Sequence, residues 1–236
     1  MRTKRFVCFL TMGLVALAVA QPATGAPCTW VTPAPGPSAD AATLMMVAPL
    51  GTQQNDWDTA ALKGCLQLKS LLTAGNSKLL GFDSPADASL AQIGMPFDIY
   101  TVGIDKLRDY LPGKPVEPLF EKIDARFYPL SVAGEVRSSL VVSQRKSTNE
   151  LITTSWGLMR LAKVVTKYRT SPNQFIVWCP DLNIHLLGIH PDDTFILIPL
   201  ATRKSLGLEE GVPVSASVAF ALLAHYARTI DTAKPG

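Results

Sequence analysis

The chain has 236 residues, of which 47% are hydrophobic and 17% charged, enough for one substantial core and short for two full domains. This composition excludes an intrinsically disordered chain. The formal net charge of +3 comes from the first 20 residues, and the remainder holds 19 basic and 19 acidic residues. Nucleic acid is therefore not expected as a partner, because binding it requires a surplus of Lys and Arg.

The amino terminus has the pattern of a secretory signal peptide. Arg2, Lys4 and Arg5 precede an uncharged apolar run over residues 6–20, which is too short to span a bilayer comfortably. An A-x-A pattern of small residues ends at Ala20, so we expect cleavage after this residue. We therefore predict a secreted or periplasmic protein that keeps no transmembrane segment after cleavage.

Three segments follow from this division: a signal peptide over 1–20, a leader over 21–40 and one globular α+β domain over 41–232. The leader is rich in Pro, Ala, Gly and Ser, which is typical of an extended linker. Hydrophobic periodicity and turn residues then predict the elements of the domain. In chain order these are a strand over 43–50, helices over 58–73 and 84–93, a strand over 96–102, a helix over 105–110, strands over 127–132, 135–143 and 150–156, a helix over 158–169, strands over 175–179, 183–189 and 194–201, and a helix over 215–228.

Two local patterns support this order. The sequence Ser84-Pro85-Ala86-Asp87 combines a capping serine, a proline at the first helical position and an acidic residue three positions after the cap. In the strand over 135–143, apolar and polar residues alternate, which predicts one buried and one solvated side.

The predicted fold class is α+β, with a mainly antiparallel sheet of about six to eight strands and helices packed mainly on one face. Consecutive strands joined by short turns favour antiparallel pairing. The last two thirds have the element order βββα twice, about 48 residues apart. Because the residues of the two units do not match, this is an architectural similarity and not a sequence repeat.

Three cysteines remain after signal removal: Cys28, Cys65 and Cys179. An oxidising compartment favours one disulfide among them and one buried thiol. Cys65 belongs to the apolar stripe of the helix over 58–73. The identity of the pair stays open at this point, because it depends on distances between α-carbons.

The stretch 175–201 carries most of the residues with chemical potential. His185, His190, Asp192 and Asp193 could supply metal ligands, but His185 and His190 are five residues apart and point to opposite faces of a continuous strand. Adjacent aspartates after His190 also suit a turn. We therefore predict no metal site.

A nucleophilic site would combine Cys179 or Cys65 with His185 and an acid such as Asp181. No oxyanion-hole motif accompanies these residues, and an exported protein favours a disulfide or a buried thiol. His225 lies in an apolar helix and is interpreted as a core histidine. No sequence motif for a catalytic serine, a phosphate-binding loop or a metalloprotease is present, so no catalytic residue and no cofactor are predicted.

The remaining candidates are binding residues. Arg160, Lys163 and Lys167 line one face of the helix over 158–169 and could contact an anion or an acidic partner. Trp156 and Trp178 end two strands and would form a platform for a peptide, glycan or lipid if they shared an exposed rim.

The leading hypothesis is an exported, non-catalytic binding or interaction module with a protein, glycan or small-molecule partner. It would bind through an uncovered sheet face or a sheet edge. One alternative is a hydrolase that uses Cys179 and His185 or a histidine-based metal site. A second alternative is a structural component of the cell envelope.

Overall fold

The computed structural model describes residues 52–190 and 194–231, with side chains described over 56–190 and 194–230. The signal peptide, the leader, the strand expected over 43–50, Cys28, Asp192 and Asp193 lie outside these residues. Within the described ranges the α-helices are α1 (Thr52–Leu71), α2 (Pro85–Ser89), α3 (Ile104–Asp109), α4 (Met159–Lys167) and α5 (Ala216–Asp231). The strands are β1 (Gln92–Ile93), β2 (Phe97–Thr101), β3 (Glu121–Val132), β4 (Glu135–Gln144), β5 (Leu151–Trp156), β6 (Phe175–Cys179), β7 (Ile184–Ile189), β8 (Ile196–Pro199) and β9 (Val214–Ser215).

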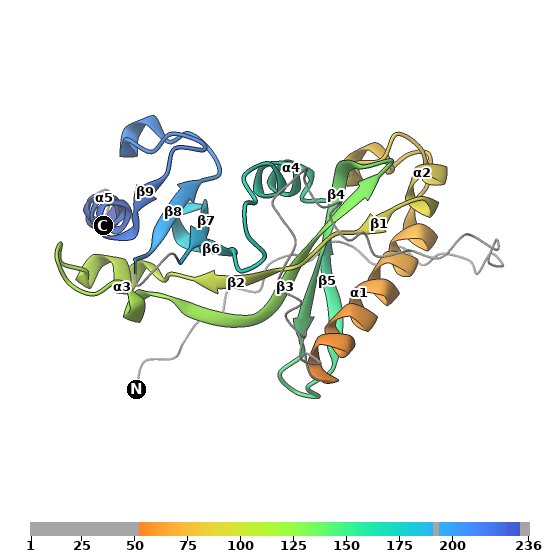
Figure 1. The fold of residues 1–236 in the computed structure, drawn as a ribbon, viewed down its shortest axis with the longest axis horizontal. Coiled ribbons are helices and arrows are strands. Elements are labelled where there is room, and N and C mark those ends of the chain that lie inside the picture. The colour runs from red at the N-terminus through yellow and green to blue at the C-terminus, as the bar shows by residue number, and fades with distance from the viewer. Residues whose placement is uncertain (1–51, 191–193, 232–236) are drawn as a thin grey trace, which may run out of the picture.

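All nine of these strands belong to one open sheet with the order β5-β4-β3-β2-β6-β7-β8-β9, and β1 pairs with β3 beside this path. Each neighbouring pair is antiparallel except β2 and β6, which are parallel. Figure 1 shows the long strand β3 running between two lobes, with α1 and α2 in one and α3 and α5 in the other.

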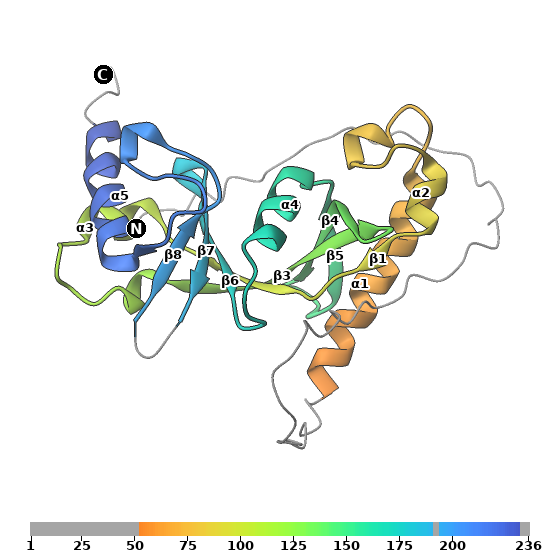
Figure 2. The ribbon, with the colours of Figure 1, turned by 45° about the horizontal axis from the view of Figure 1, so that its top comes forward.

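Alternating side chains divide the core between the two faces of the sheet. One face carries an α1-side core, which includes Tyr128 and Leu140, and an α5-side core, which includes Val177 and Leu186. The opposite face carries an α4-side core, which includes Phe127, the neighbour of Tyr128 in β3. Helices α1, α2, α3 and α5 therefore cover one face, and α4 covers the middle of the other (Figure 2).

The predicted α+β class with a mainly antiparallel sheet is confirmed, and the helices lie mainly on one face with α4 as the exception. The capping box is also present: the Asp87 amide donates to Ser84 Oγ at 3.3 Å, and the Ser84 amide donates to Asp87 Oδ2 at 2.9 Å. Helix α2 nevertheless ends at Ser89, because Gln92 and Ile93 pair with β3 as strand β1.

The expected wet side of β4 is absent, because α1 and α4 cover its opposite faces. Ser138 and Ser139 are adjacent in β4, and each is 0% exposed. Ser139 Oγ accepts a hydrogen bond from the Leu158 amide at 3.1 Å, at the start of α4. Hydrophobic alternation could not reveal this, because serine satisfies a pattern of polar residues whether or not it is buried.

Helix α1 crosses β5 at a glycine that permits close approach. A Cβ atom at Gly64 would lie 2.0 Å from Thr153 Oγ1 and 3.0 Å from its Cβ. The Trp156 indole N–H donates to the Gly64 carbonyl at 3.2 Å, so the helix backbone is also held directly by β5. The contact requires a residue without a side chain at position 64.

We predict that Gly64→Ala destabilises the fold by about 1 kcal/mol, although alanine is the better helix former. Its Cβ would overlap Thr153, whose stiff branched side chain cannot retreat without moving β5. Chemical denaturation measures the change. The double variant Gly64→Ala/Thr153→Ala should recover most of the loss, because Thr153 Oγ1 has no hydrogen-bond partner among the described residues.

Gly75→Ala is the matched control, since its Cβ would meet only Thr73 Oγ1 at 3.8 Å. If Gly64→Ala stabilised the protein as helix propensity alone dictates, the proposed close approach of α1 to β5 would be wrong.

Candidate functional site

A groove between the start of α4 and the β7–β8 pair is the candidate site, and we call it the α4 groove. Its volume is about 430 Å³, within the range of small-molecule sites. It is lined by Gly157, Leu158, Met159, Arg160, Leu161, Asn183, Ile184, His185, Pro199, Leu200, Ala201, Arg203 and Leu208.

The walls of the groove are mainly apolar. Leu200 and Leu208 are buried on the sheet side, and Leu158 and Met159 remain 43% and 37% exposed at the start of α4. Large exposed apolar side chains beside an apolar cavity are typical of a binding surface, because a ligand can remove them from water.

Most of the polar side chains that line the groove are basic: two arginines and one histidine. Arg160 and Arg203 both line it, together with His185, and no Asp or Glu belongs to its lining. Arg203 Nη2 donates to the Asn183 carbonyl at 2.7 Å, which fixes this guanidinium at the edge of β7. Within the described part of the chain, Arg160 takes part in no ion pair.

His185 projects from β7 on the α4 side of the sheet and stacks on Trp178 of β6. The two rings are 5° from parallel, with centroids 6.1 Å apart. Burial lowers the pKa of His185, and the charge of Arg203 lowers it further. Both effects favour the neutral form of the imidazole at the wall of the groove.

The basic residues predicted on α4 have different surroundings. Lys163 pairs with Glu135 at 3.5 Å, and Lys167 donates to Tyr168 Oη at 3.0 Å. Arg160 alone of the three lines the groove. The sequence therefore identified one of the two arginines that line the groove. Arg203 was missed because it lies in the segment after β8, where no helical or strand pattern marks the face to which a side chain belongs.

The two tryptophans do not share a rim. Trp156 packs against the α1-side core and donates its indole N–H to Gly64. Trp178 faces the opposite side of the sheet, since its successor Cys179 belongs to the α5-side core. Only Trp178 is near the groove, through its stack on His185.

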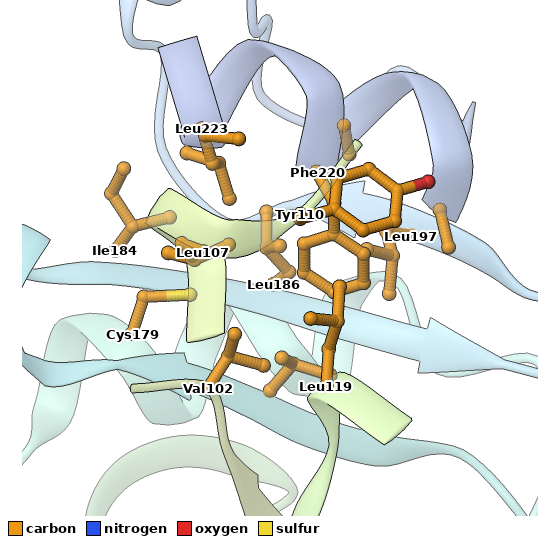
Figure 3. Packing of buried hydrophobic residues seen from close by; sticks show 14 of the residues in the cluster. Val102, Leu107, Tyr110, Leu119, Cys179, Ile184, Leu186, Leu197, Phe220 and Leu223 are labelled. Carbon is orange, nitrogen blue, oxygen red and sulfur yellow. The ribbon is translucent and has the colours of Figure 1, made fainter. Parts of the chain in front are cut away.

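The pair Cys179 and His185 is not assembled as a nucleophilic site. The strand register places Trp178 opposite His185 and Cys179 opposite Ile184, so the thiol and the imidazole lie on different faces. Figure 3 shows Cys179 among Leu107, Ile184 and other apolar side chains. Burial and the nearby charge of Asp181 raise the pKa of Cys179 to about 12, so the thiol is protonated at neutral pH.

The histidine-based metal set is also dispersed. His190 is exposed and packs edge-on against Phe195, with centroids 4.2 Å apart, whereas His185 lies in the α4 groove. Asp192 and Asp193 lie outside the described residues. Among residues 52–190 and 194–231, no three His, Cys, Asp or Glu side chains are grouped to hold a metal ion.

His225 is exposed, so its interpretation as a core histidine is wrong. Helix α5 buries one stripe, made by Ala219, Phe220, Leu223, Ala224 and Ala227. His225 lies on the opposite side with Val218 and Leu222, which are 50% and 37% exposed. The error arose because α5 is apolar on both sides, which hides the direction of the core.

A larger cleft of about 870 Å³, the α1 cleft, separates α1 from β3 and the β4–β5 pair. Several of its charged side chains pair with one another. Asp98 binds Lys122 at 2.6 Å and Arg126 at 3.2 Å, and Arg126 lies 4.9 Å from the centre of the Trp57 ring. These pairs partly neutralise the charge of the cleft, so we take the α4 groove as the candidate site.

Comparison with known proteins gives no identification: no family model matches the chain, and no curated protein or solved structure matches it either. None of the helices in the described ranges has both the length and the apolar character needed to cross a membrane. Function must therefore be inferred from the sites of the chain itself.

The thiols provide a direct test of the cysteine assignments. Cys179 is free and buried, so the disulfide expected from the sequence is predicted to join Cys28 and Cys65 in the mature chain. We expect no labelling of the native, unreduced protein at pH 8, one labelled thiol at Cys179 after denaturation, and three after reduction. Peptide mapping by mass spectrometry assigns the sites. Rapid native labelling of Cys179, or three thiols without reduction, would contradict these assignments.

The pKa of His185 predicts how stability depends on pH. Because this pKa is lower in the folded than in the unfolded chain, the unfolded chain binds the proton more tightly. His185 therefore reduces stability as pH falls through about 6.5, its unfolded value, until the folded pKa is reached. Urea unfolding between pH 7.5 and 5 should show a flatter profile for His185→Gln than for wild type. Parallel profiles would refute this role.

Proposed function

We propose that this protein is an exported, non-catalytic binding module and that the α4 groove binds a small ligand with an apolar body. The observation that carries this proposal is an open groove of ligand size with apolar walls and few polar groups. The signal-peptide pattern supports export to a secreted or periplasmic location.

The fold restricts where binding can occur. Four helices cover one face of the sheet, and α4 covers the middle of the other. The α4 groove is a hollow beside α4 on that second face. From the sequence we expected binding at an uncovered sheet face or a sheet edge. We now propose the α4 groove, which is smaller and better defined than a whole sheet face.

The surroundings of the ionisable groups favour binding over catalysis. The Cys179 thiol has a raised pKa and lies on the face away from His185, so it does not act as a nucleophile with this base. His185 itself is positioned by its stack on Trp178 and projects into a mainly apolar groove. These features suit recognition of a ligand by its shape and apolar surface.

The neutral dye Nile red, whose fluorescence rises in apolar surroundings, tests this proposal. We expect saturable binding to the mature protein and an affinity about fivefold lower for Leu158→Gln, which removes apolar surface from the groove rim. The matched control is Leu90→Gln, because Leu90 is 62% exposed and does not line the groove. Equal loss in both variants, or no saturable binding to wild type, would refute the groove as the ligand site.

A further inference from the structure

We infer that the ligand of the α4 groove is a small amphipathic anion, a carboxylate, sulfate or sulfonate carried on an alkyl chain. This inference rests on the proposed function, because it names the class of ligand for the same groove. It follows from the distribution of charge around the apolar walls.

The first step is the excess of positive charge. Arg160 comes from α4 and Arg203 from the segment after β8, so the two guanidinium groups enter the groove from different elements. The Arg203 side chain is oriented by the Asn183 carbonyl through one N–H group, and a guanidinium has five such donors. An anionic head group can therefore accept hydrogen bonds from Arg203 without disturbing its contact to β7.

The second step concerns the carboxylates, none of which belongs to the lining of the groove. Glu135 binds Arg137 at 2.9 Å and Lys163 at 3.5 Å. Asp181 accepts a hydrogen bond from the Ile104 amide at 3.3 Å, at the start of α3. The cations of the groove thus face no carboxylate among its lining residues, and an anion from solution would supply the missing charge.

The third step concerns the body of the ligand. Leu158 and Met159 on one wall and Leu200 and Leu208 on the other can enclose an unbranched apolar chain. Guanidinium groups at such a site fix one end of the ligand, and the apolar walls bind the rest. A cationic or neutral head group would forgo the attraction to both arginines.

Displacement of Nile red at constant pH and ionic strength tests the ligand class. Decane-1-sulfonate should compete at least about tenfold more strongly than decyltrimethylammonium or decan-1-ol, because a hydrogen bond to a charged group contributes about that factor. Its head group stays ionised throughout the working range. Shortening the chain to octane-1-sulfonate should weaken competition by up to about fourfold per methylene group lost.

Charge variants locate the head group. Arg160→Glu should weaken decane-1-sulfonate binding by at least about tenfold more than it weakens Nile red binding, and Arg160→Lys should retain most of the affinity for the sulfonate. Lys163→Glu is the matched control, because it makes the same change of charge on α4 outside the groove.

The outcomes separate the two claims. If Nile red binds in the groove and all three decyl compounds compete equally, the inferred charge preference is wrong and the proposed function stands. Equal weakening by Arg160→Glu and Lys163→Glu would also overturn the inference, since it would reflect net charge alone. If Nile red itself does not bind, the proposed function fails together with the inference.

Discussion

The fold depends on strand β2, which pairs with two strands that run in opposite directions to each other. Strand β2 is antiparallel to β3 and parallel to β6, and this second pairing joins the two halves of the sheet. Parallel neighbours cannot be linked by a hairpin. After the end of β2 the chain must therefore return to the side of the sheet where β2 began before it can enter β6. Strands β3, β4 and β5 and helix α4 lie within that connection, and α4 brings the chain back across the second face.

The position of the groove follows from this return. Helix α4 has nine residues, and its buried positions Ala162 and Val165 pack on the middle of the sheet. It begins after Gly157, whose φ of 86° lets the chain turn out of β5. The α4-side core also includes Leu187 of β7 and Ile198 of β8, and the α4 groove is the hollow that remains between the start of α4 and this strand pair. The site is therefore a product of the sheet topology.

Local patterns predicted much of the fold, because they depend on residues close in the chain. The capping box at Ser84 and the meander from β3 to β5 are both of this kind. The parallel pairing of β2 with β6 joins residues about 77 positions apart, as in Ile99 and Ile176. The hydrophobic pattern of either strand does not indicate which strand it will pair with. For the same reason Arg160 could be proposed from its helix, whereas the contribution of Arg203 depends on where β7 and β8 place the following segment.

The pleat of β6 and β7 decides which chemistry the stretch 175–201 can perform. Cys179 and His185 are close in sequence and lie on adjacent strands, which suggested a shared site. A shift of one residue in the pairing would exchange the faces of every side chain, so register controls the outcome. In the observed register Trp178 faces His185, and Cys179 joins Ile184 under α3 and α5. Cys179 therefore belongs to the α5-side core, whereas the His185 imidazole lines the α4 groove together with Arg160 and Arg203.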